Sequence, residues 1–308
     1  MECKVSKYNL LLFVLLIAFV CSCKKESSAA LMAMEDNQID RYLQLHNLNI
    51  KPTASGLYFQ SIIDGEGDSP SLKDFVTISY AATTLDGKLF DTSNQADAKA
   101  NNIITSCAID GPVKLYMQSI SIRGLIEGLL QMQEGGKAWM LMPASLTFDD
   151  YIPRIYEVTL VKVIHDPVAY ENEKITNYLD TINRSFTPNL TLTPADSTTD
   201  GIYYIETLAG TGENPKDGDQ LNLSYTLNLI DGQSIGSNTN YSCKVGDSNL
   251  IAGFNSGIKK MKKGGKAIFI IPYDMAYGVA GFNQNGIILI PMYATLVYHV
   301  ELKGITPP

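Results

Sequence analysis

The chain has 308 residues, and its 24 basic and 32 acidic side chains give a formal net charge of −8. The few Lys and Arg residues form no long stripe, which argues against nucleic-acid binding through phosphate contacts. Hydrophobic residues make up 45% of the chain, which excludes a disordered protein, and this length favours two domains. The 24 Gly and 13 Pro residues indicate β-rich, turn-rich structure.

The first 22 residues are typical of an export signal. Lys4 and Lys7 precede the apolar run Leu10 to Val20, which is too short to span a bilayer as a permanent helix. A small residue directly before Cys23 resembles a bacterial lipobox, in which cleavage exposes a cysteine that then carries diacylglycerol. The sequence Cys23-Lys24-Lys25-Glu26 also resembles the export tag of Bacteroidetes-type lipoproteins. We expect lipidation at Cys23 and a membrane anchor made by lipid; an ordinary secretory signal cut nearby is the alternative.

Once this signal is set aside, the remaining thiols are Cys107 and Cys243. They could pair in an oxidising compartment or stay as two buried thiols. No Cys/His spacing typical of a metal site occurs, and His46, His165 and His299 are scattered along the chain. We therefore expect no metal and no cofactor.

Two halves of the chain repeat one residue pattern. Ser55-Gly56-Leu57-Tyr58 corresponds to Asp200-Gly201-Ile202-Tyr203, and the Gly-xxx-Gly block at Gly124 corresponds to the block at Gly253. The first copy carries an insertion, roughly Gln95 to Ser119, and a charged segment of helical period precedes each copy. The expected segments are a signal peptide (1–22), a tether with a short lead-in helix (23–46), a first domain (47–166), a helical linker (167–196) and a second domain (197–308).

Each copy is predicted to consist of strands and one short helix. The first strand alternates apolar and polar residues, and the Asp-Gly pair after it suits a hairpin turn. A Gly-Gly pair after the helix is interpreted as a left-handed helix cap. In the two copies the expected elements are strands at 76–80 and 221–225, helices at 125–132 and 254–261, buried strands at 138–142 and 267–271, and final strands at 156–163 and 295–302. The pattern predicts an α+β fold, with an antiparallel sheet wrapped on one short helix in each copy.

Four sequence blocks carry a family resemblance. The first copy has the segment Asp86 to Ser93 and the segment Ile122 to Leu125, and the second has Ala276-Tyr277-Gly278 and the run Ile290 to Val297. With these blocks, both copies resemble FKBP-type peptidyl-prolyl cis-trans isomerase domains over most of the mature chain. The resemblance implies two FKBP-like domains that rotate Xaa-Pro bonds without covalent catalysis. The chemistry needs only an apolar pocket, because the twisted amide that has lost its resonance is less polar than the planar one.

By this resemblance the second copy would form the more complete pocket. Catalytic roles are expected for Tyr225, Ile251, Phe254, Tyr277, Ile290 and Tyr298, and substrate contacts for Ile235, Tyr241 and Leu250. Phe254 would be the pocket floor, where the family usually has Trp. The Ile251 N–H and the Tyr277 hydroxyl would donate to substrate carbonyls. Gly236 stands where the family has Asp, so the carboxylate beside the bound amide is missing.

The first copy shows the complementary half of the family pattern. Its expected substrate-binding residues are Tyr80, Phe90, Asp91, Ile122, Leu125 and Phe148, and Tyr156 would join them. Leu125 replaces the aromatic floor, Phe148 lacks the hydroxyl of the family's Tyr, and the loop before Ile152-Pro153 is short. Other interpretations stay open: the aromatic residues could be core residues, Asp91 could only close a loop, and Tyr277-Gly278 could be a plain turn.

These observations predict a lipid-anchored peptidyl-prolyl isomerase of the bacterial cell envelope. We expect an outer membrane lipoprotein that faces the periplasm or the cell surface and assists the folding of exported, Pro-containing or unfolded polypeptides. The alternative is a catalytically weak or inactive FKBP-like binding protein, chaperone or scaffold. A structural role in an envelope assembly is a third hypothesis.

Overall fold

The computed structural model describes residues 27–185 and 197–308. The expected signal peptide, the lipidation site Cys23 and the end of the expected linker lie outside these residues. The chain divides into two compact units, residues 1–48 and residues 49–308. Within the described ranges, no helix is long and apolar enough to cross a membrane.

The described part of the first unit is helix α2 (Ser28–Leu45), which is longer than the short helix expected there. Ser27 caps its N-terminus, because the Ser27 hydroxyl accepts a hydrogen bond from the Ala30 N–H at 3.3 Å. At the C-terminal end, the rings of Tyr42 and His46 lie one turn apart with centroids separated by 4.2 Å.

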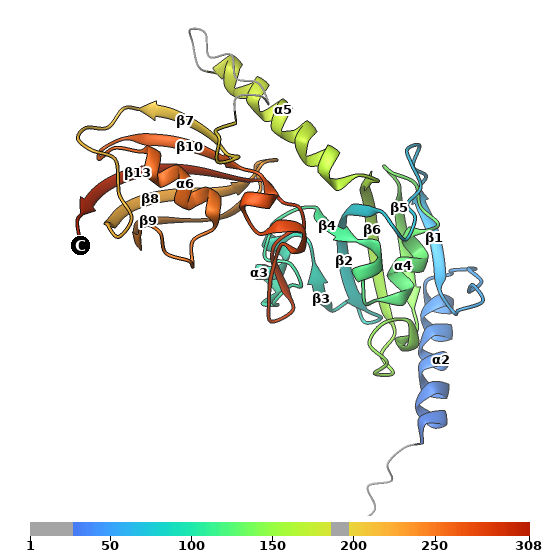
Figure 1. Ribbon diagram of the computed structural model, residues 1–308. Helices are drawn as coiled ribbons and strands as arrows, with labels where there is room; N and C mark the ends of the chain where they lie inside the picture. The colour runs from blue at the N-terminus through green and yellow to red at the C-terminus, as the bar shows by residue number, and fades with distance from the viewer. Residues whose placement is uncertain (1–26, 186–196) are drawn as a thin grey trace, which may run out of the picture. The chain divides into compact units, whose positions relative to one another are not determined.

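In the second unit, the first repeat forms a six-stranded antiparallel sheet in the order β1-β5-β6-β2-β3, with β4 also paired to β2. Its elements are β1 (Tyr58–Ile63), β2 (Phe75–Thr84), β3 (Leu89–Thr92), α3 (Gln95–Asn101), β4 (Val113–Tyr116), η1 (Met117–Ser119), α4 (Arg123–Leu129), β5 (Lys137–Met142), η2 (Ala144–Leu146) and β6 (Arg154–Ile164). The insertion expected from the sequence, roughly Gln95 to Ser119, comprises α3, a loop, β4 and η1, and its loop part lies between β3 and β4. Both of these strands pair with β2 (Figure 1).

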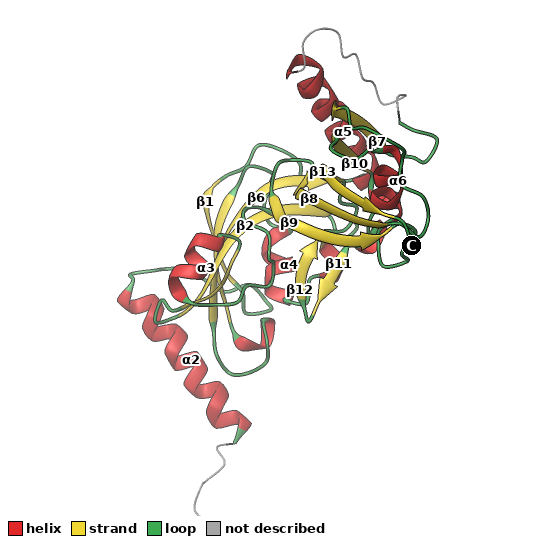
Figure 2. Cartoon of the chain, turned by 90° about the vertical axis from the view of Figure 1, so that its left-hand side faces the viewer, coloured by secondary structure: helices red, strands yellow, loops and turns green. Residues whose placement is uncertain are grey.

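The second repeat forms a five-stranded antiparallel sheet in the order β7-β10-β13-β8-β9 and a separate hairpin, β11–β12. Its elements are α5 (Pro167–Ser185), β7 (Tyr203–Leu208), β8 (Gln220–Leu229), β9 (Ser234–Lys244), α6 (Ala252–Lys260), β10 (Lys266–Ile271), η4 (Tyr273–Met275), η5 (Gly278–Ala280), β11 (Phe282–Gln284), β12 (Ile287–Ile290) and β13 (Leu296–Thr306). Figure 2 shows the strands in yellow and the helices in red. The predicted α+β class with antiparallel sheets is confirmed.

One short helix covers a face of each sheet and encloses a hydrophobic core. Leu125 and Leu129 of α4 lie in the first core, and Phe254 and Ile258 of α6 lie in the second. The Gly-xxx-Gly pattern allows this close packing. A Cβ on Gly257 would lie only 2.6 Å from the ring of Phe269 in β10.

The predicted role of the Gly-Gly pairs is wrong. Helix α4 ends at Leu129 and α6 at Lys260, before either pair begins. Gly135 and Gly264, with φ of 85° and 82°, lie instead in the turns that lead into β5 and β10. A Cβ on Gly136 would lie 2.8 Å from the Gln133 carbonyl oxygen, so the pair marks a tight turn rather than a helix cap.

Helix α5, within the expected linker, is packed against the second sheet. Ile175, Leu179 and Ile182 are buried in a cluster with residues of β7, β10 and β13. This cluster lies apart from the core under α6. Both remaining cysteines, Cys107 and Cys243, are buried free thiols.

Candidate functional site

All nine residues that were expected to form the second repeat's pocket lie in or against its hydrophobic core, where Phe254, Ile290 and Tyr298 are only 3%, 4% and 8% exposed. Tyr225 lies on β8, Ile235 and Tyr241 on β9, Phe254 on α6 and Tyr298 on β13. These five residues belong to one hydrophobic cluster with the remaining four, Leu250, Ile251, Tyr277 and Ile290. Residues distant in the sequence therefore meet beside the N-terminus of α6.

The centre of this cluster is aromatic. The Tyr225 ring centroid lies 5.4 Å from that of Tyr241, 5.5 Å from that of Tyr298 and 6.2 Å from that of Phe254. The centroids of Phe254 and Tyr298 are 4.9 Å apart. Burial and neighbouring tyrosines raise the pKa of Tyr298 and of Tyr277, so both hydroxyls stay protonated and can donate.

Hydrogen-bonding groups lie at the edge of the aromatic cluster. Ile251 is the N-cap residue of α6, and its N–H has no acceptor within residues 27–185 and 197–308. The Tyr277 ring stacks on Phe282 of β11, with centroids 5.4 Å apart. Gly236, on β9, has no atom within 4 Å of the position that a Cβ would take, so space for a carboxylate side chain is open there.

The first repeat also assembles an aromatic group. Tyr80 of β2 and Tyr156 of β6 have ring centroids 6.2 Å apart, and Phe90 of β3 lies 6.0 Å from Tyr156. Phe148 lies 6.4 Å from Phe90. The Arg154 guanidinium lies 4.5 Å from the centre of the Phe148 ring, a cation–π contact at the position where the family has Tyr.

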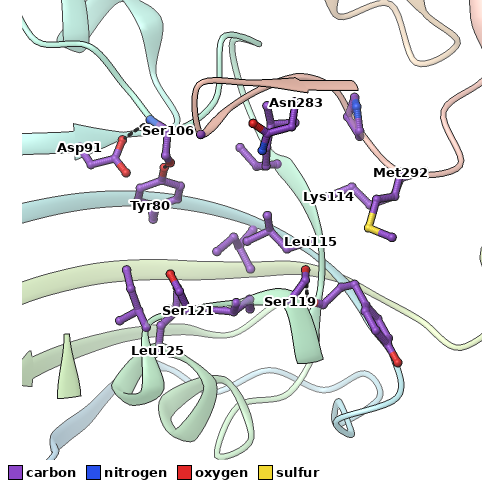
Figure 3. A pocket seen from close by; sticks show the side chains of 18 of the residues that line it. Tyr80, Asp91, Ser106, Lys114, Leu115, Ser119, Ser121, Leu125, Asn283 and Met292 are labelled. Atoms are coloured by element: carbon purple, nitrogen blue, oxygen red, sulfur yellow. Dashed lines mark hydrogen bonds between the residues drawn. The ribbon is translucent and has the colours of Figure 1, made fainter. Parts of the chain in front are cut away.

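Asp91 is held by hydrogen bonds at the edge of this group. Its Oδ1 accepts from the Thr92 N–H at 2.9 Å and from the Ser106 N–H at 3.0 Å. The hydroxyls of Ser106 and Tyr80 are hydrogen-bonded at 2.8 Å, as Figure 3 shows. Burial and the Asp91 carboxylate raise the pKa of Tyr80. Asp91 thus closes the start of the insertion and also borders the pocket.

Ser106 is a pocket residue that was not predicted. It lies in the insertion, 26 residues from its partner Tyr80. No local pattern marks it, because its position depends on how the insertion folds back over β2.

A cavity of about 470 Å³ lies over the first repeat's aromatic group (Figure 3). Of the expected residues, Tyr80, Asp91, Ile122, Leu125 and Phe148 line it, as does Tyr156. Phe90 does not line it and lies behind Tyr156 and Phe148. The cavity also has walls from the second repeat, which the sequence did not predict.

No cluster of three or more His, Cys, Asp or Glu side chains that could hold a metal ion occurs in the described ranges. The two sites consist of aromatic and aliphatic side chains with a few hydrogen-bonding groups. Their chemistry is suited to binding and reorienting a chain, since neither site presents a nucleophile paired with a general base.

Antiparallel sheets, each covered by one short helix beside a group of aromatic side chains, define the class of protein. The chain belongs to the FKBP-type peptidyl-prolyl cis-trans isomerase family, whose model matches residues 67–174 and 211–303. Each repeat thus contains one matching segment.

Three known proteins illustrate the similarity. The chain is 37% identical over 109 residues to the FKBP-type peptidyl-prolyl cis-trans isomerase FkpA of Escherichia coli, covering 35% of this chain and 38% of that protein. It is 38% identical over 111 residues to FK506-binding protein 1 of Candida glabrata, covering 34% of this chain and 94% of that protein. A solved peptidyl-prolyl cis-trans isomerase from Pseudomonas syringae aligns with a TM-score of 0.36 and 24% identity, covering 46% of this chain and 97% of that one. The chain spans well under half the length of FkpA.

Proposed function

We propose that this chain is a lipid-anchored peptidyl-prolyl cis-trans isomerase that assists the folding of exported proteins, with the second repeat as its catalytic site. The observation that carries the proposal is the placement of Tyr225 in contact distance of the Tyr241, Phe254 and Tyr298 rings. Membership of the isomerase family supports the reaction class.

The proposed mechanism depends on an apolar environment for the amide that rotates and on hydrogen bonds that hold the substrate chain in position. Rotation about an Xaa-Pro bond meets a barrier of about 18–20 kcal/mol, because it breaks amide resonance. Phe254 and Tyr298 lie in the core beneath the site. The partly buried Tyr225, Tyr241 and Tyr277 rings would supply an apolar surface on which the less polar, twisted amide is favoured over the planar one. The Ile251 N–H and the Tyr277 O–H would donate to carbonyls that flank the proline and hold the chain in place. A thousandfold acceleration requires only about 4 kcal/mol, and no proton is transferred.

The test uses the full chain. Cys107, Ile109 and Val113 of the first repeat are buried in the hydrophobic cluster of the second, so cutting between the repeats would expose that core. The rate of cis–trans exchange about the Leu-Pro bond of an Ala-Leu-Pro-Phe peptide would be measured with the wild type and with the Tyr277→Phe variant. Loss of one hydrogen bond of about 1–1.5 kcal/mol predicts about tenfold lower kcat/KM.

Tyr273→Phe is the matched control, because Tyr273 lies on η4 next to the site but stacks on Tyr293 instead. We expect its kcat/KM to equal that of the wild type. An inactive full chain, or a Tyr277→Phe variant as active as the wild type, would contradict the proposed catalytic site.

Gly236 favours a second candidate function, binding without turnover. With glycine at this position, β9 presents no carboxylate to the bound amide. The chain would then act as a chaperone or scaffold for unfolded or Pro-containing segments. Binding of an unfolded model protein without acceleration of peptide exchange would favour this function over catalysis.

The proposed location is the outer membrane, facing the periplasm or the cell surface. Its support is the sequence alone: an apolar run, a small residue and then Cys23. The Cys23→Ser variant should move from the membrane fraction to the soluble fraction after cell lysis. Unchanged membrane retention would remove the lipid anchor from the proposal.

A further inference from the structure

Besides the insertion, the two repeats differ in the loop before their last long strand. In the first repeat, the short segment 147–153 connects η2 to β6. In the second repeat, the corresponding connection between η4 and β13 contains η5 and the hairpin β11–β12. The first repeat therefore lacks a hairpin that the second repeat possesses.

The hairpin of the second repeat pairs with the insertion of the first. The Ile288 carbonyl accepts from the Ala108 N–H at 2.9 Å, and the Ile288 N–H donates to the Ser106 carbonyl at 3.0 Å. Cys107 and Ile288 form a parallel bridge. In Figure 1 a red loop that precedes β13 lies beside α3 of the insertion.

This pairing places hairpin side chains over the first repeat's pocket. Phe282, Asn283 and Ile288 line the cavity from one side, and Met292 lines it just after β12. Leu125 lies on the opposite wall, and Figure 3 shows Asn283 and Met292 across the cavity from it. The second repeat thus supplies a wall where the first repeat's own loop is short.

Further contacts, from the turn between β8 and β9 and from α5, hold the second repeat against the first. The Gln233 side-chain amide donates to the Asp110 carbonyl at 3.0 Å and to the Pro112 carbonyl at 3.1 Å. Lys114 forms a buried ion pair with Glu171 at the start of α5. Lys114 also lines the cavity, so its ion pair joins the cavity lining directly to α5.

A tyrosine in the cavity lining has a buried hydroxyl that lacks a partner. Tyr156 is only 1% exposed, and its hydroxyl has no hydrogen-bond partner in the part of the chain that the structure describes. A buried hydroxyl left unpaired is unfavourable, and a ligand carbonyl that reached it would supply the missing acceptor. The volume of about 470 Å³ lies within the roughly 300–1,000 Å³ typical of ligand pockets, and the lining is mostly apolar.

We propose that the β11–β12 hairpin completes a second polypeptide-binding site on the first repeat, and that this composite site forms only while the repeats are docked. The choice of ligand rests on the proposed function: an extended apolar segment containing proline, with a backbone carbonyl that accepts from the Tyr156 hydroxyl. Leu125 and Phe148 provide apolar contact but no aromatic floor and no hydroxyl. The composite site therefore holds the segment, while the second repeat rotates the Xaa-Pro bond.

Binding is tested in the full chain with the Ala-Leu-Pro-Phe peptide as probe, by following the backbone amide NMR signals of Ser121 and Ile122. Asn283→Trp would fill the cavity from the hairpin side, and we expect at least tenfold weaker binding at these signals. Gln284→Trp is the matched control, because Gln284 is the exposed neighbour on β11 and does not line the cavity. Equal affinity of the Asn283→Trp variant and the wild type would overturn the proposal.

A disulfide tests whether the docked state is the binding state. Bridge partners in a sheet lie roughly 5 Å apart, within the range that a disulfide spans. Ile288→Cys should pair with Cys107, in a Cys243→Ala background that leaves no other described thiol. We expect the oxidised variant to bind the probe at least as tightly as its reduced form. Loss of binding on oxidation would show that the hairpin covers the site instead of completing it.

The rate of cis–trans peptide exchange, measured on the same samples, distinguishes failure of the proposed catalysis from failure of the proposed composite site. If exchange is not accelerated but the Ser121 and Ile122 signals shift and Asn283→Trp abolishes the shift, the composite site stands and the proposed catalysis fails. If exchange depends on Tyr277 but these signals do not shift, catalysis stands and the composite site fails.

Discussion

A buried ion pair joins the two repeats and offers a direct test of their docking. Lys114 Nζ lies 2.6 Å from Glu171 Oε1, and the two side chains are only 9% and 4% exposed. The other carboxylate oxygen of Glu171 accepts from the Thr295 N–H at 3.0 Å. Burial lowers the pKa of Lys114, although Glu171 acts to raise it. Glu171→Gln keeps the side-chain shape and an acceptor for Thr295 but removes the negative charge.

This substitution should cost about 3–5 kcal/mol, the usual range for removing one partner of a buried pair. Lys114 can escape part of the cost by releasing its proton. At pH 7 that release costs about 4.6 kcal/mol for a lysine with a solution pKa of about 10.4, which sets an upper limit on the charge contribution. The unfolded variant then binds one proton more than the folded variant. The stability of the variant should therefore rise with pH, by up to about 1.4 kcal/mol per unit below pH 10.4.

Urea unfolding at pH 7 and pH 9 measures both effects. Glu173→Gln, an exposed change two residues further along α5, should stay within about 0.5 kcal/mol of the wild type at both pH values. A loss below 1 kcal/mol for Glu171→Gln, or a loss that does not diminish at pH 9, would refute the argument that the ion pair stabilises the docked repeats.

Three further predictions concern single positions. Gly236→Asp has open space for its side chain and should raise kcat/KM for peptide exchange about tenfold; an unchanged rate would show that the carboxylate is not limiting. The hydrogen bond from His165 to Asp74, at 2.8 Å, raises the pKa of His165 above 6.5. Its stabilising effect is thus complete below pH 6.5 and is lost as the pH rises through the folded-state pKa; an NMR titration giving a value below 6.5 would contradict this. Gly257→Ala would force a Cβ against Phe269 and should destabilise the protein by about 1–3 kcal/mol in urea unfolding, despite the better helix propensity of Ala; equal stability would show that the helix can shift.

Local patterns in the sequence predicted most of the strands and helices of each repeat. Leu221 and Leu223 are buried on β8 and Tyr225 is partly buried next to them, as their alternation indicated. The family resemblance then grouped residues far apart in the chain, such as Phe254 and Tyr298, whose rings do meet. Both kinds of inference work inside one repeat, because the fold of a single repeat determines those contacts.

One Gly of each Gly-Gly pair was correctly predicted to adopt positive φ, but the structure predicted for the pairs, a helix cap, was wrong. Gly135 and Gly264 do adopt positive φ, which suits a helix cap and a tight turn equally well. The helices end several residues earlier, so the turn is the structure formed. The sequence could not distinguish the two, since the residues between Leu129 and Gly135 continue an apolar pattern compatible with a helix.

Contacts between the repeats had no local signal. Ile288 is one of several apolar residues in its segment, and nothing in its neighbourhood indicates pairing with Cys107. That pairing requires the insertion, the hairpin and the buried side chain of Glu171 to meet at once. The docking depends on the total area that the two repeats bury against each other. The residue pattern of one repeat does not predict that area.

This docking changes the interpretation of both departures from the family pattern. The shortened loop at 147–153 indicated decay of the first site when that repeat was considered alone, yet the hairpin from the second repeat lies beside the same cavity. The insertion of the first repeat contributes Cys107 and Ile109 to the core of the second, so it is more than a surface loop. Each repeat thus supplies a segment to its neighbour at the place where the two copies differ in length. The insertion of the first repeat and the hairpin of the second meet in one interface, so the lining of the first repeat's cavity is a property of the pair of repeats.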